Sequence, residues 1–276
     1  MTFNTARQLN YFMATSTDDN IHYIGTSADD LITRNTYINR KNFADDGMKF
    51  FHRLAKKYYD IDDSDGYFLD LGANIGTTCI YFKKMLTPNL KILAFEPAPE
   101  NFKLLRANLI LNDVDNAVVE NYGLGDEETE MTMNIAPWNP AANRLFSDLN
   151  KTYSQTVKII PLDKYFAEKN ISPKDVKYIW LDTEGFEAQV LLGAKNILTE
   201  NPAPIFMEFN PRAWQETNYY DKMINFLDKI YIGFVLVREA LKTGKIEVLP
   251  IKSLHNFKNA KENIGYLGDI FLVHKL

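Results

Sequence analysis

Cysteine is nearly absent from this chain of 276 residues, because Cys79 is its single example. One thiol cannot form an intramolecular disulfide or a cysteine-rich structural zinc site. Cys79 lies in an apolar helical run, so we expect a small core residue and not a nucleophile. The fold therefore depends on an apolar core, to which 46% of the residues can contribute.

The chain also lacks an excess of positive charge and any long apolar run. Lys and Arg number 31 against 36 Asp and Glu, which gives a formal net charge of -5. Such a chain has no overall positive potential that would attract a polyphosphate backbone, so we expect no nucleic-acid partner. No stretch approaches the roughly 18 consecutive apolar residues that span a bilayer, and the polar start MTFNTARQLN is unlike a signal peptide. We therefore expect a cytoplasmic protein without a membrane partner.

Strand-like and helix-like segments alternate from Tyr67 onward. Strands are expected at Tyr67–Leu71, Lys91–Glu96, Ala117–Tyr122, Tyr178–Asp182 and Ile205–Phe209, and helices at Ile75–Leu86, Pro99–Leu111, Phe186–Leu198 and Trp214–Ile230. This alternation predicts parallel strands with right-handed crossovers, as in a doubly wound α/β sheet. The last strand-like runs, GFVLVRE and GDIFLVHK, are separated by a long polar stretch over about 242–262. They predict an antiparallel C-terminal edge strand.

Two regions fall outside the alternation. Residues 1–65, with a predicted helix over Phe43–Tyr59, are expected to form a helical cap packed on the main domain, residues 66–276. Residues 131–165 read as an insertion, with short strands MTMNI and VKIIPL around the loop APWNPAANRLFSD. Insertions at the carboxyl edge of such a sheet usually carry substrate selectivity.

The segment DLGANIG, from Asp70 to Gly76, joins the first strand to the first helix. Gly72 and Gly76 allow a sharp turn and let a ligand approach the backbone closely. Asp70 can accept hydrogen bonds from an ammonium group. Glu96, at the end of the next strand, is placed to bind both hydroxyls of a ribose. The combination predicts a nucleoside cofactor at the carboxyl edge of the sheet.

Two cofactors compete for this motif. NAD is bound by G-x-G-x-x-G, where a helix N-terminus faces a pyrophosphate. Here the corresponding residues are Gly72, Asn74 and Gly76, and Asp70 would repel a phosphate but suits the ammonium of a methionine. The motif favours S-adenosylmethionine, and an ordinary tight turn with a chance acid is the remaining alternative.

The segments YFLDLGANIGTTCIYF, AFEPAPENFKLLRANLILN, NYGLGD and YIWLDTEGFEAQVLLGA resemble the FkbM family of methyltransferases over about residues 65–210. The resemblance implies the class I methyltransferase (Rossmann-like) fold. It also implies S-adenosylmethionine, with its methionine part at the glycine turn, its ribose at Glu96 and its adenine beside the second and third strands. The implied cofactor-binding residues are Asp70, Gly72, Ala73, Asn74, Gly76, Thr77, Glu96, Pro97, Ala98, Gly123, Leu124 and Asp182.

One residue departs from the family pattern. The family usually has a lysine two residues before the strand-ending aspartate, and this chain has Trp180 there. Either Trp180 is a packing residue, or any role of that lysine in relatives is carried out differently in this protein, or this protein acts on a different acceptor.

Acids at the ends of the later strands are the candidates for catalysis. Transfer to an alcohol requires removal of a proton, which a well-placed carboxylate speeds by roughly 10²–10⁴-fold. Neighbouring parallel strands end in one crevice, so the predicted catalytic residues are Asp182, Glu184 and Glu208. Capping of the next helix is the alternative role of Asp182, and Glu187 is expected to be structural.

Asp182, Glu208 and Asn210 also resemble the oxygen ligands that catechol-type methyltransferases use for Mg²⁺. The FkbM family is not generally described as metal-dependent, so we assign no metal, and a chelator would test the alternative.

The fold alone cannot name the acceptor. We expect methylation of a hydroxyl oxygen on a small metabolite or sugar. The alternatives are N-methylation of an amine or peptide, and a cofactor-binding protein without catalysis. A homodimer is among the arrangements that the sequence permits.

Overall fold

A computed structural model of the protein describes residues 12–26, 31–135, 153–257 and 268–274. Its centre is an eight-stranded sheet in the order β12-β11-β13-β10-β9-β3-β4-β5. The first strand of this sheet along the chain, β3, lies in its middle, and the later strands are added on both sides of it. This is the doubly wound arrangement of class I methyltransferases. The parallel strands are β3 (Tyr67–Leu71), β4 (Lys91–Phe95), β5 (Ala117–Glu120), β9 (Val176–Leu181) and β10 (Ile205–Glu208).

The C-terminal strand β13 (Asp269–His274) runs antiparallel to both of its neighbours, β10 and β11 (Tyr231–Leu236). The predicted antiparallel C-terminal strand is confirmed, but β13 lies between β10 and β11. The edge is formed by the two-residue β12 (Leu249–Pro250), which is also antiparallel. The predicted strand GFVLVRE is too long, because helix α11 begins at its fifth residue. The polar stretch that follows contains a short 3₁₀ helix.

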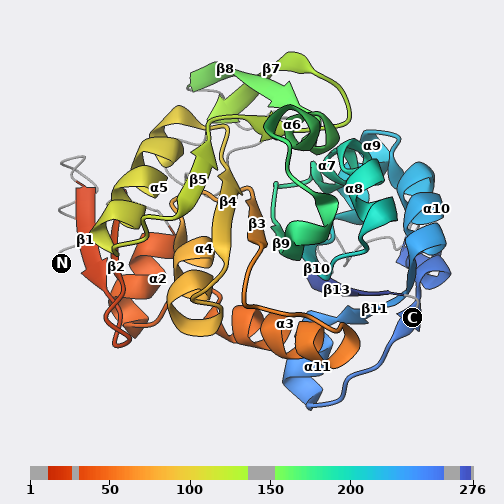
Figure 1. The fold of residues 1–276 in the computed structure, drawn as a ribbon, viewed down its shortest axis with the longest axis horizontal. Helices are drawn as coiled ribbons and strands as arrows, with labels where there is room; N and C mark the ends of the chain where they lie inside the picture. Colours follow the sequence, from red (N-terminus) through yellow and green to blue (C-terminus); the bar gives the residue numbers. More distant parts are fainter. Residues whose placement is uncertain (1–11, 27–30, 136–152, 258–267, 275–276) are drawn as a thin grey trace.

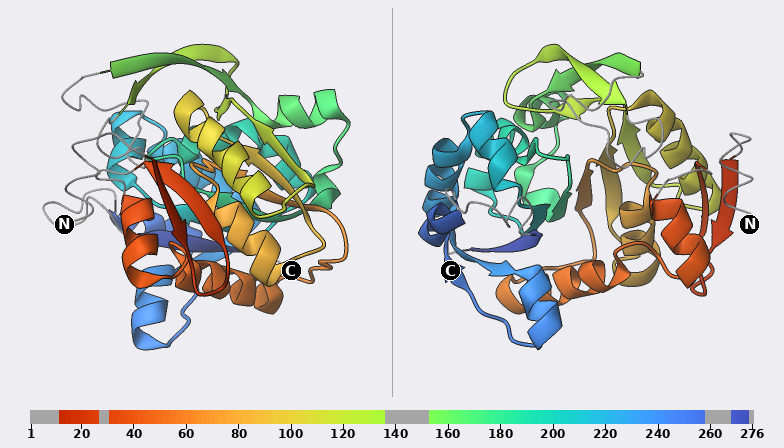
Figure 2. Two further views of the ribbon diagram at one scale, coloured as in Figure 1. Left: turned by 90° about the vertical axis from the view of Figure 1, so that its left-hand side faces the viewer. Right: turned by 180° about the vertical axis from the view of Figure 1, so that it is seen from behind.

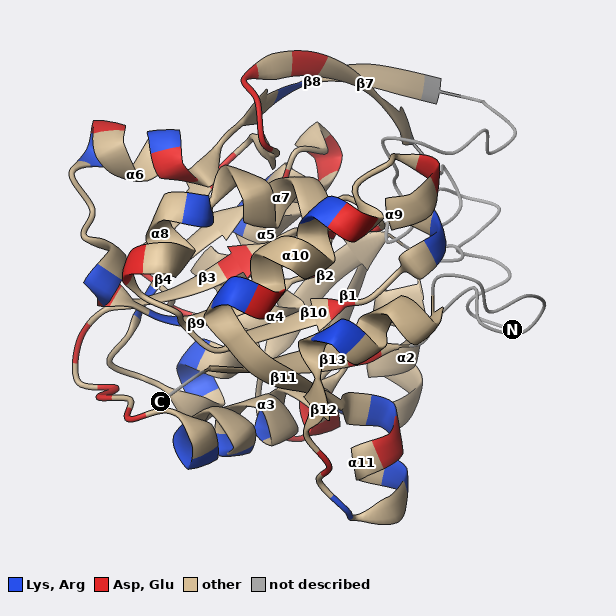
Figure 3. Ribbon diagram, turned by 90° about the vertical axis from the view of Figure 1, so that its right-hand side faces the viewer, with Lys and Arg blue, Asp and Glu red and all other residues tan. Residues whose placement is uncertain are grey.

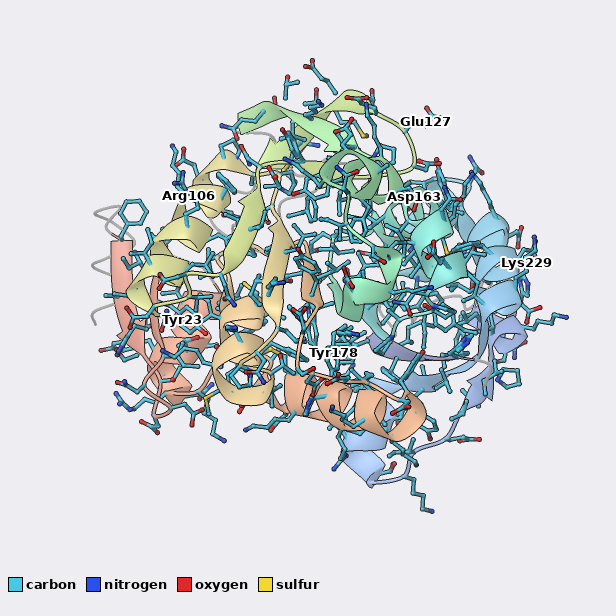
Figure 4. The ribbon with its side chains drawn as sticks, in the orientation of Figure 1. Tyr23, Arg106, Glu127, Asp163, Tyr178 and Lys229 are labelled. Carbon is cyan, nitrogen blue, oxygen red and sulfur yellow. The ribbon has the colours of Figure 1, made fainter. Side chains whose placement is uncertain are left out.

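Helices cover both faces of this sheet (Figure 1). The two faces have separate apolar cores, because side chains alternate along each strand. On β9, Tyr178 and Trp180 face α3, whereas Ile179 and Leu181 face the opposite layer. Figure 4 labels Tyr178 beside α3. One layer contains α3 (Asp45–Tyr58), α4 (Thr77–Tyr81), α5 (Pro99–Leu111) and α11 (Val237–Thr243), and the other contains α6 (Leu162–Lys169), α7 (Glu187–Gly193), α8 (Lys195–Glu200), α9 (Pro211–Glu216) and α10 (Tyr220–Ile230).

Three predicted helices have different limits in the structure. The first begins at Thr77, because Gly76 has φ of +90°, and it ends in a π-helical turn over Phe82–Leu86. The helix expected over 186–198 is divided into α7 and α8 at Ala194. The helix expected over 214–230 is divided into α9 and α10 by a turn in which Asn218 has φ of +62°. None of the helices within the described ranges is long and apolar enough to cross a membrane.

The insertion forms a small sheet of its own. Strands β7 (Thr129–Ile135) and β8 (Tyr153–Ile160) pair antiparallel, and β6 (Gly123–Leu124) pairs parallel with β8. The predicted loop APWNPAANRLFSD lies outside the described residues. Figure 1 shows this hairpin on the opposite side of the molecule from α3 and α11.

The N-terminal region contains a hairpin that the sequence analysis does not anticipate. Strands β1 (Phe12–Ser16) and β2 (His22–Thr26) pair antiparallel, and helix α2 (Leu31–Asn39) follows. The cap is therefore only partly helical. Figure 2 shows the hairpin at the side of the molecule that carries α5, whereas α3 packs against the C-terminal strand β13.

Asn108 of α5 and Asn112, the C-cap residue of this helix, hold the hairpin in place. The side chain of Asn108 accepts from Ile24 N (2.6 Å) and donates to Ile24 O (3.0 Å), as a paired strand would. Asn112 does the same with His22, at 2.9 and 2.6 Å. Asn108 Nδ2 also donates to Ile75 O (2.8 Å), in the glycine turn. One buried side chain therefore links the hairpin to that turn.

We expect Asn108→Ala to lower the free energy of unfolding by about 2 to 4 kcal/mol, because it leaves several polar backbone groups of Ile24 and Ile75 without partners. Urea denaturation measures this loss. Ile110→Ala is the matched control on the same helix, since Ile110 is 74% exposed, and it should change stability by less than about 0.5 kcal/mol. Equal effects of the two substitutions would contradict the bridging role of Asn108.

Candidate functional site

The turn between β3 and α4 is held tightly by its neighbours. The N–H groups of Gly72 and Ala73 both donate to Phe95 O, at 3.0 and 2.9 Å. Gly72 has φ of +98°, and a Cβ there would lie 1.9 Å from the backbone oxygen of Asp182. Only glycine fits at this position, because any side chain would collide with the end of β9. Asn74 also adopts a left-handed conformation, with φ of +50°.

Glu96 braces the same turn from the end of β4. Its Oε2 accepts from Asn74 N (2.8 Å) and its Oε1 from Ala98 N (2.9 Å). Burial raises the pKa of Glu96 to about 7, although these two N–H groups act in the opposite direction. Each carboxylate oxygen has a second lone pair that could accept from a hydroxyl.

Asp70 lies fully buried beneath the turn. Its Oδ2 accepts from Cys79 N (3.1 Å), at the start of α4, whereas Oδ1 has no hydrogen-bond partner among the described residues. Burial raises the pKa of Asp70 to about 7. An orphaned carboxylate oxygen is costly, and a nearby positive charge would offset that cost. Thr77, also predicted at this site, is buried, and its carbonyl accepts from Tyr23 of the hairpin at 3.4 Å (Figure 4).

The residues predicted to flank an adenine do lie together. A Cβ on Gly123 would lie 3.5 Å from Pro97 Cβ, and Gly123 and Leu124 are both buried in β6. Asn121, which the sequence analysis missed, donates from Nδ2 to Glu96 O (2.8 Å) and Pro97 O (3.0 Å). A polar residue just after the third strand is the signal that could have identified it.

The loop after β9 is organised by Glu187. Glu187 Oε1 accepts from Thr183 N (3.0 Å), Thr183 Oγ1 (3.1 Å) and Gly185 N (3.0 Å). Its Oε2 accepts from Trp214 Nε1 at 3.5 Å. Glu187 is fully buried, so it has the structural role expected of it. The capping alternative for Asp182 is wrong, because the N-cap residue of α7 is Phe186, and no side chain of the described chain caps that helix end.

Three acids follow one another across the carboxyl edge of the sheet. Glu208 is paired in register with Asp269 of β13, and Asp182 comes one residue after Leu181, which pairs with Met207. We call Asp182, Glu208 and Asp269 the acid row. Asp269 was missed by the sequence analysis, because its position depends on β13 lying next to β10.

Burial is the main cause of the raised pKa values in this row. Burial raises the pKa of Glu208 to about 10, with further repulsion from Glu187, Asp182 and Glu184. Burial also raises the pKa of Asp269, to about 6. Asp182 is open to solvent on one side, yet the protein around it and the charges of Glu184 and Glu187 raise its pKa well above the usual range. Glu184, the other predicted catalytic residue, is partly buried in the same loop, with φ of +55°.

One of the three candidate Mg²⁺ ligands, Asn210, has a structural role. Asn210 Oδ1 accepts from Ala213 N (3.1 Å) and caps α9. Within the residues that the structure describes, no group of three or more His, Cys, Asp or Glu side chains is arranged to hold a metal ion.

Trp180 is a packing residue. It is 6% exposed and stacks on Phe206, with ring centroids 4.0 Å apart and planes at 8°. Phe51 of α3 contacts both rings. The structure therefore supports a packing role for Trp180 at the position where the family usually has a lysine.

Known proteins share the part of the chain that carries these residues. The sequence profile of the methyltransferase FkbM domain matches residues 70–236. "Methyltransferase 1" of Beauveria bassiana (strain ARSEF 2860) is 28% identical over 169 residues, which cover 53% of this chain and 67% of that relative. "Methyltransferase sdnD" of Sordaria araneosa is 36% identical over 104 residues, which cover 36% of this chain and 40% of that relative.

A crystal structure of methyltransferase FkbM from Methylobacillus flagellatus KT aligns with 98% of this chain and 58% of its own chain, at 14% identity and a TM-score of 0.47. The chain thus spans less than two thirds of the length of that protein and of sdnD.

The raised pKa values predict an unusual pH dependence of stability. Asp70 and Glu96 have folded pKa values of about 7, above those of an unfolded chain, so the cofactor-free folded state binds more protons than the unfolded state near neutrality. The free energy of unfolding should therefore rise as pH falls from about 8 to about 5.5, by about 2 kcal/mol for each group.

Urea denaturation across this pH range measures the effect, and Asp70→Asn should remove its share of the slope. Asp62→Asn is the control, because hydrogen bonds from Ser64 lower the pKa of this exposed acid and place its titration below the window. A stability that falls steadily over the same interval would contradict the assignment.

Proposed function

The chain belongs to the FkbM family of methyltransferases, and from this premise we propose that it transfers a methyl group from S-adenosylmethionine to a hydroxyl oxygen of a small metabolite or sugar. The family membership supports methyl transfer as the reaction, and the acceptor is our proposal. A cytoplasmic location and the absence of nucleic-acid or membrane partners are part of the proposal. Figure 3 shows both signs of charge interspersed along α9, α10 and α11, which supports the proposed absence of a nucleic-acid partner.

One observation carries the cofactor assignment. The glycine turn is braced by Glu96 and lies over Asp70, whose buried Oδ1 has no hydrogen-bond partner in the described chain. A positively charged methionine fits this arrangement, whereas the pyrophosphate of NAD would face two buried acids. The residues that would hold the cofactor are those already predicted, with Asn121 positioning the Glu96–Pro97 backbone.

The acid row then supplies the chemistry at the acceptor. Bound S-adenosylmethionine provides a methyl group activated by its sulfonium. Asp182 is the base that can reach an acceptor, because it is the member of the acid row that is open to solvent. It would take the hydroxyl proton as the oxygen lone pair forms a bond to the methyl carbon and the electron pair of the carbon–sulfur bond moves to sulfur. Glu184 and Glu208 would adjust the charge around it.

N-methylation of an amine is the second candidate, because the acid row also suits a basic nitrogen. Analysis of the product separates the two reactions, since an O-methyl ether and an N-methyl amine have different chemical shifts and different mass fragments.

Calorimetric titration with S-adenosylmethionine tests the cofactor assignment. We expect saturable binding of S-adenosylmethionine and none of NAD. Asp70→Asn and Glu96→Gln should each weaken the affinity by about tenfold or more, since each removes a charged partner. Glu100→Gln, an exposed acid on α5, should leave the affinity unchanged. Binding of NAD alone, or unaltered affinity in both site variants, would refute the assignment.

A further inference from the structure

The acid row occupies a position where nothing in the described chain balances its charge. Asp182, Glu208 and Asp269 lie at the carboxyl ends of β9 and β10 and at the start of β13, on three neighbouring strands. Within the described residues, none of the three forms an ion pair with Lys, Arg or His. Glu208 is only 8% exposed, and its Oε2 is buried without a hydrogen-bond partner in the part of the chain that the structure covers.

Within the described residues, the layer beneath the row supplies no counter-charge. Two residues earlier on each parallel strand, and two later on β13, the same face of the sheet carries Trp180, Phe206 and Phe271. These rings are packed against Phe51 of α3, so the layer directly beneath the row is apolar. Among the described residues, the side on which Asp182 is open to solvent is the side left for a compensating charge.

The cofactor cannot balance these charges alone. S-adenosylmethionine has one net positive charge near neutral pH, and Asp70 and Glu96 already face its site. Three more acids remain on the acceptor side. Protons can neutralise them in the empty protein, as the raised pKa values of Glu208 and Asp269 indicate. A bound cation would do so while also satisfying Glu208 Oε2.

We propose that the acceptor carries an ammonium group, and that Glu208 and Asp269 of the acid row bind it beside the base Asp182. This inference rests on the proposed function, because it treats the row as the acceptor side of a methyltransferase site. It restricts the acceptor to amines, amino alcohols and amino sugars, whether a nitrogen or a neighbouring hydroxyl is methylated.

Matched pairs of probes test the inference. The protein is saturated with S-adenosylhomocysteine and then titrated with putrescine and with its neutral analogue 1,4-butanediol, and in a second series with glucosamine and with glucose. Each amine should bind about tenfold or more tightly than its neutral partner, which is the contribution of one charge-assisted hydrogen bond. The preference should decline with added salt.

Two variants locate the effect. Asp269→Asn and Glu208→Gln keep the shape of the side chain and should abolish most of the preference for amines, while leaving the affinity for S-adenosylhomocysteine unchanged. Glu168→Gln, an exposed acid on α6, is the control and should keep the full preference. Thermal unfolding of each variant confirms that it is folded.

The outcomes separate the two proposals. Tight binding of S-adenosylhomocysteine without any preference for amines, or a preference that survives both row variants, overturns the inference and leaves the proposed function standing. Failure of S-adenosylhomocysteine to bind overturns both.

Discussion

The ends of β3 and β9 meet at Gly72, where a Cβ would lie 1.9 Å from Asp182 O, and the arrangement of the site depends on this contact. A hydrogen bond from Asp182 N to Leu71 O (3.0 Å) joins the same two strand ends. The contact brings the turn that carries Asp70 beside the loop that carries Asp182. A cofactor at the first and an acceptor at the second would therefore be neighbours, which is the main requirement of a displacement reaction.

Buried negative charge is the second constraint. Asp70, Glu96 and Glu208 are almost fully enclosed, and burial raises the pKa of each. Near neutral pH the cofactor-free protein therefore holds part of these carboxyl groups in the protonated form. A cationic cofactor, and in our proposal a cationic acceptor, would replace those protons. The stability of the empty protein and its affinity for ligands are thus linked through the same carboxyl groups.

The sequence predicts the parallel part of the sheet well, and the residues expected around a cofactor lie close together in the structure, because both depend on local patterns. Strand, glycine turn, helix and terminal acid follow one another between Asp70 and Glu96, and the structure keeps them adjacent. The sequence also predicts a structural role for Glu187, in contrast to the catalytic roles that it predicts for Asp182 and Glu184.

Features that depend on distant contacts could not be predicted in this way. The hairpin β1–β2 is held by Asn108 and Asn112, some 80 to 90 residues away in the chain. Asp269 belongs to the acid row only because β13 inserts beside β10, a consequence of sheet topology and not of any local pattern. The divisions of two long helices at Ala194 and Asn218 likewise leave no break in the apolar period.

The number of protons released when S-adenosylmethionine binds tests the central claim most directly. Calorimetric titrations near pH 7 in two buffers of different ionisation enthalpy give this number, and S-adenosylhomocysteine, which lacks the sulfonium charge, is the comparison. The account predicts release of about one proton with S-adenosylmethionine and less with S-adenosylhomocysteine, because a cation lowers the pKa of carboxyl groups that are partly protonated in the empty site. Binding of S-adenosylmethionine without any release of protons would contradict it.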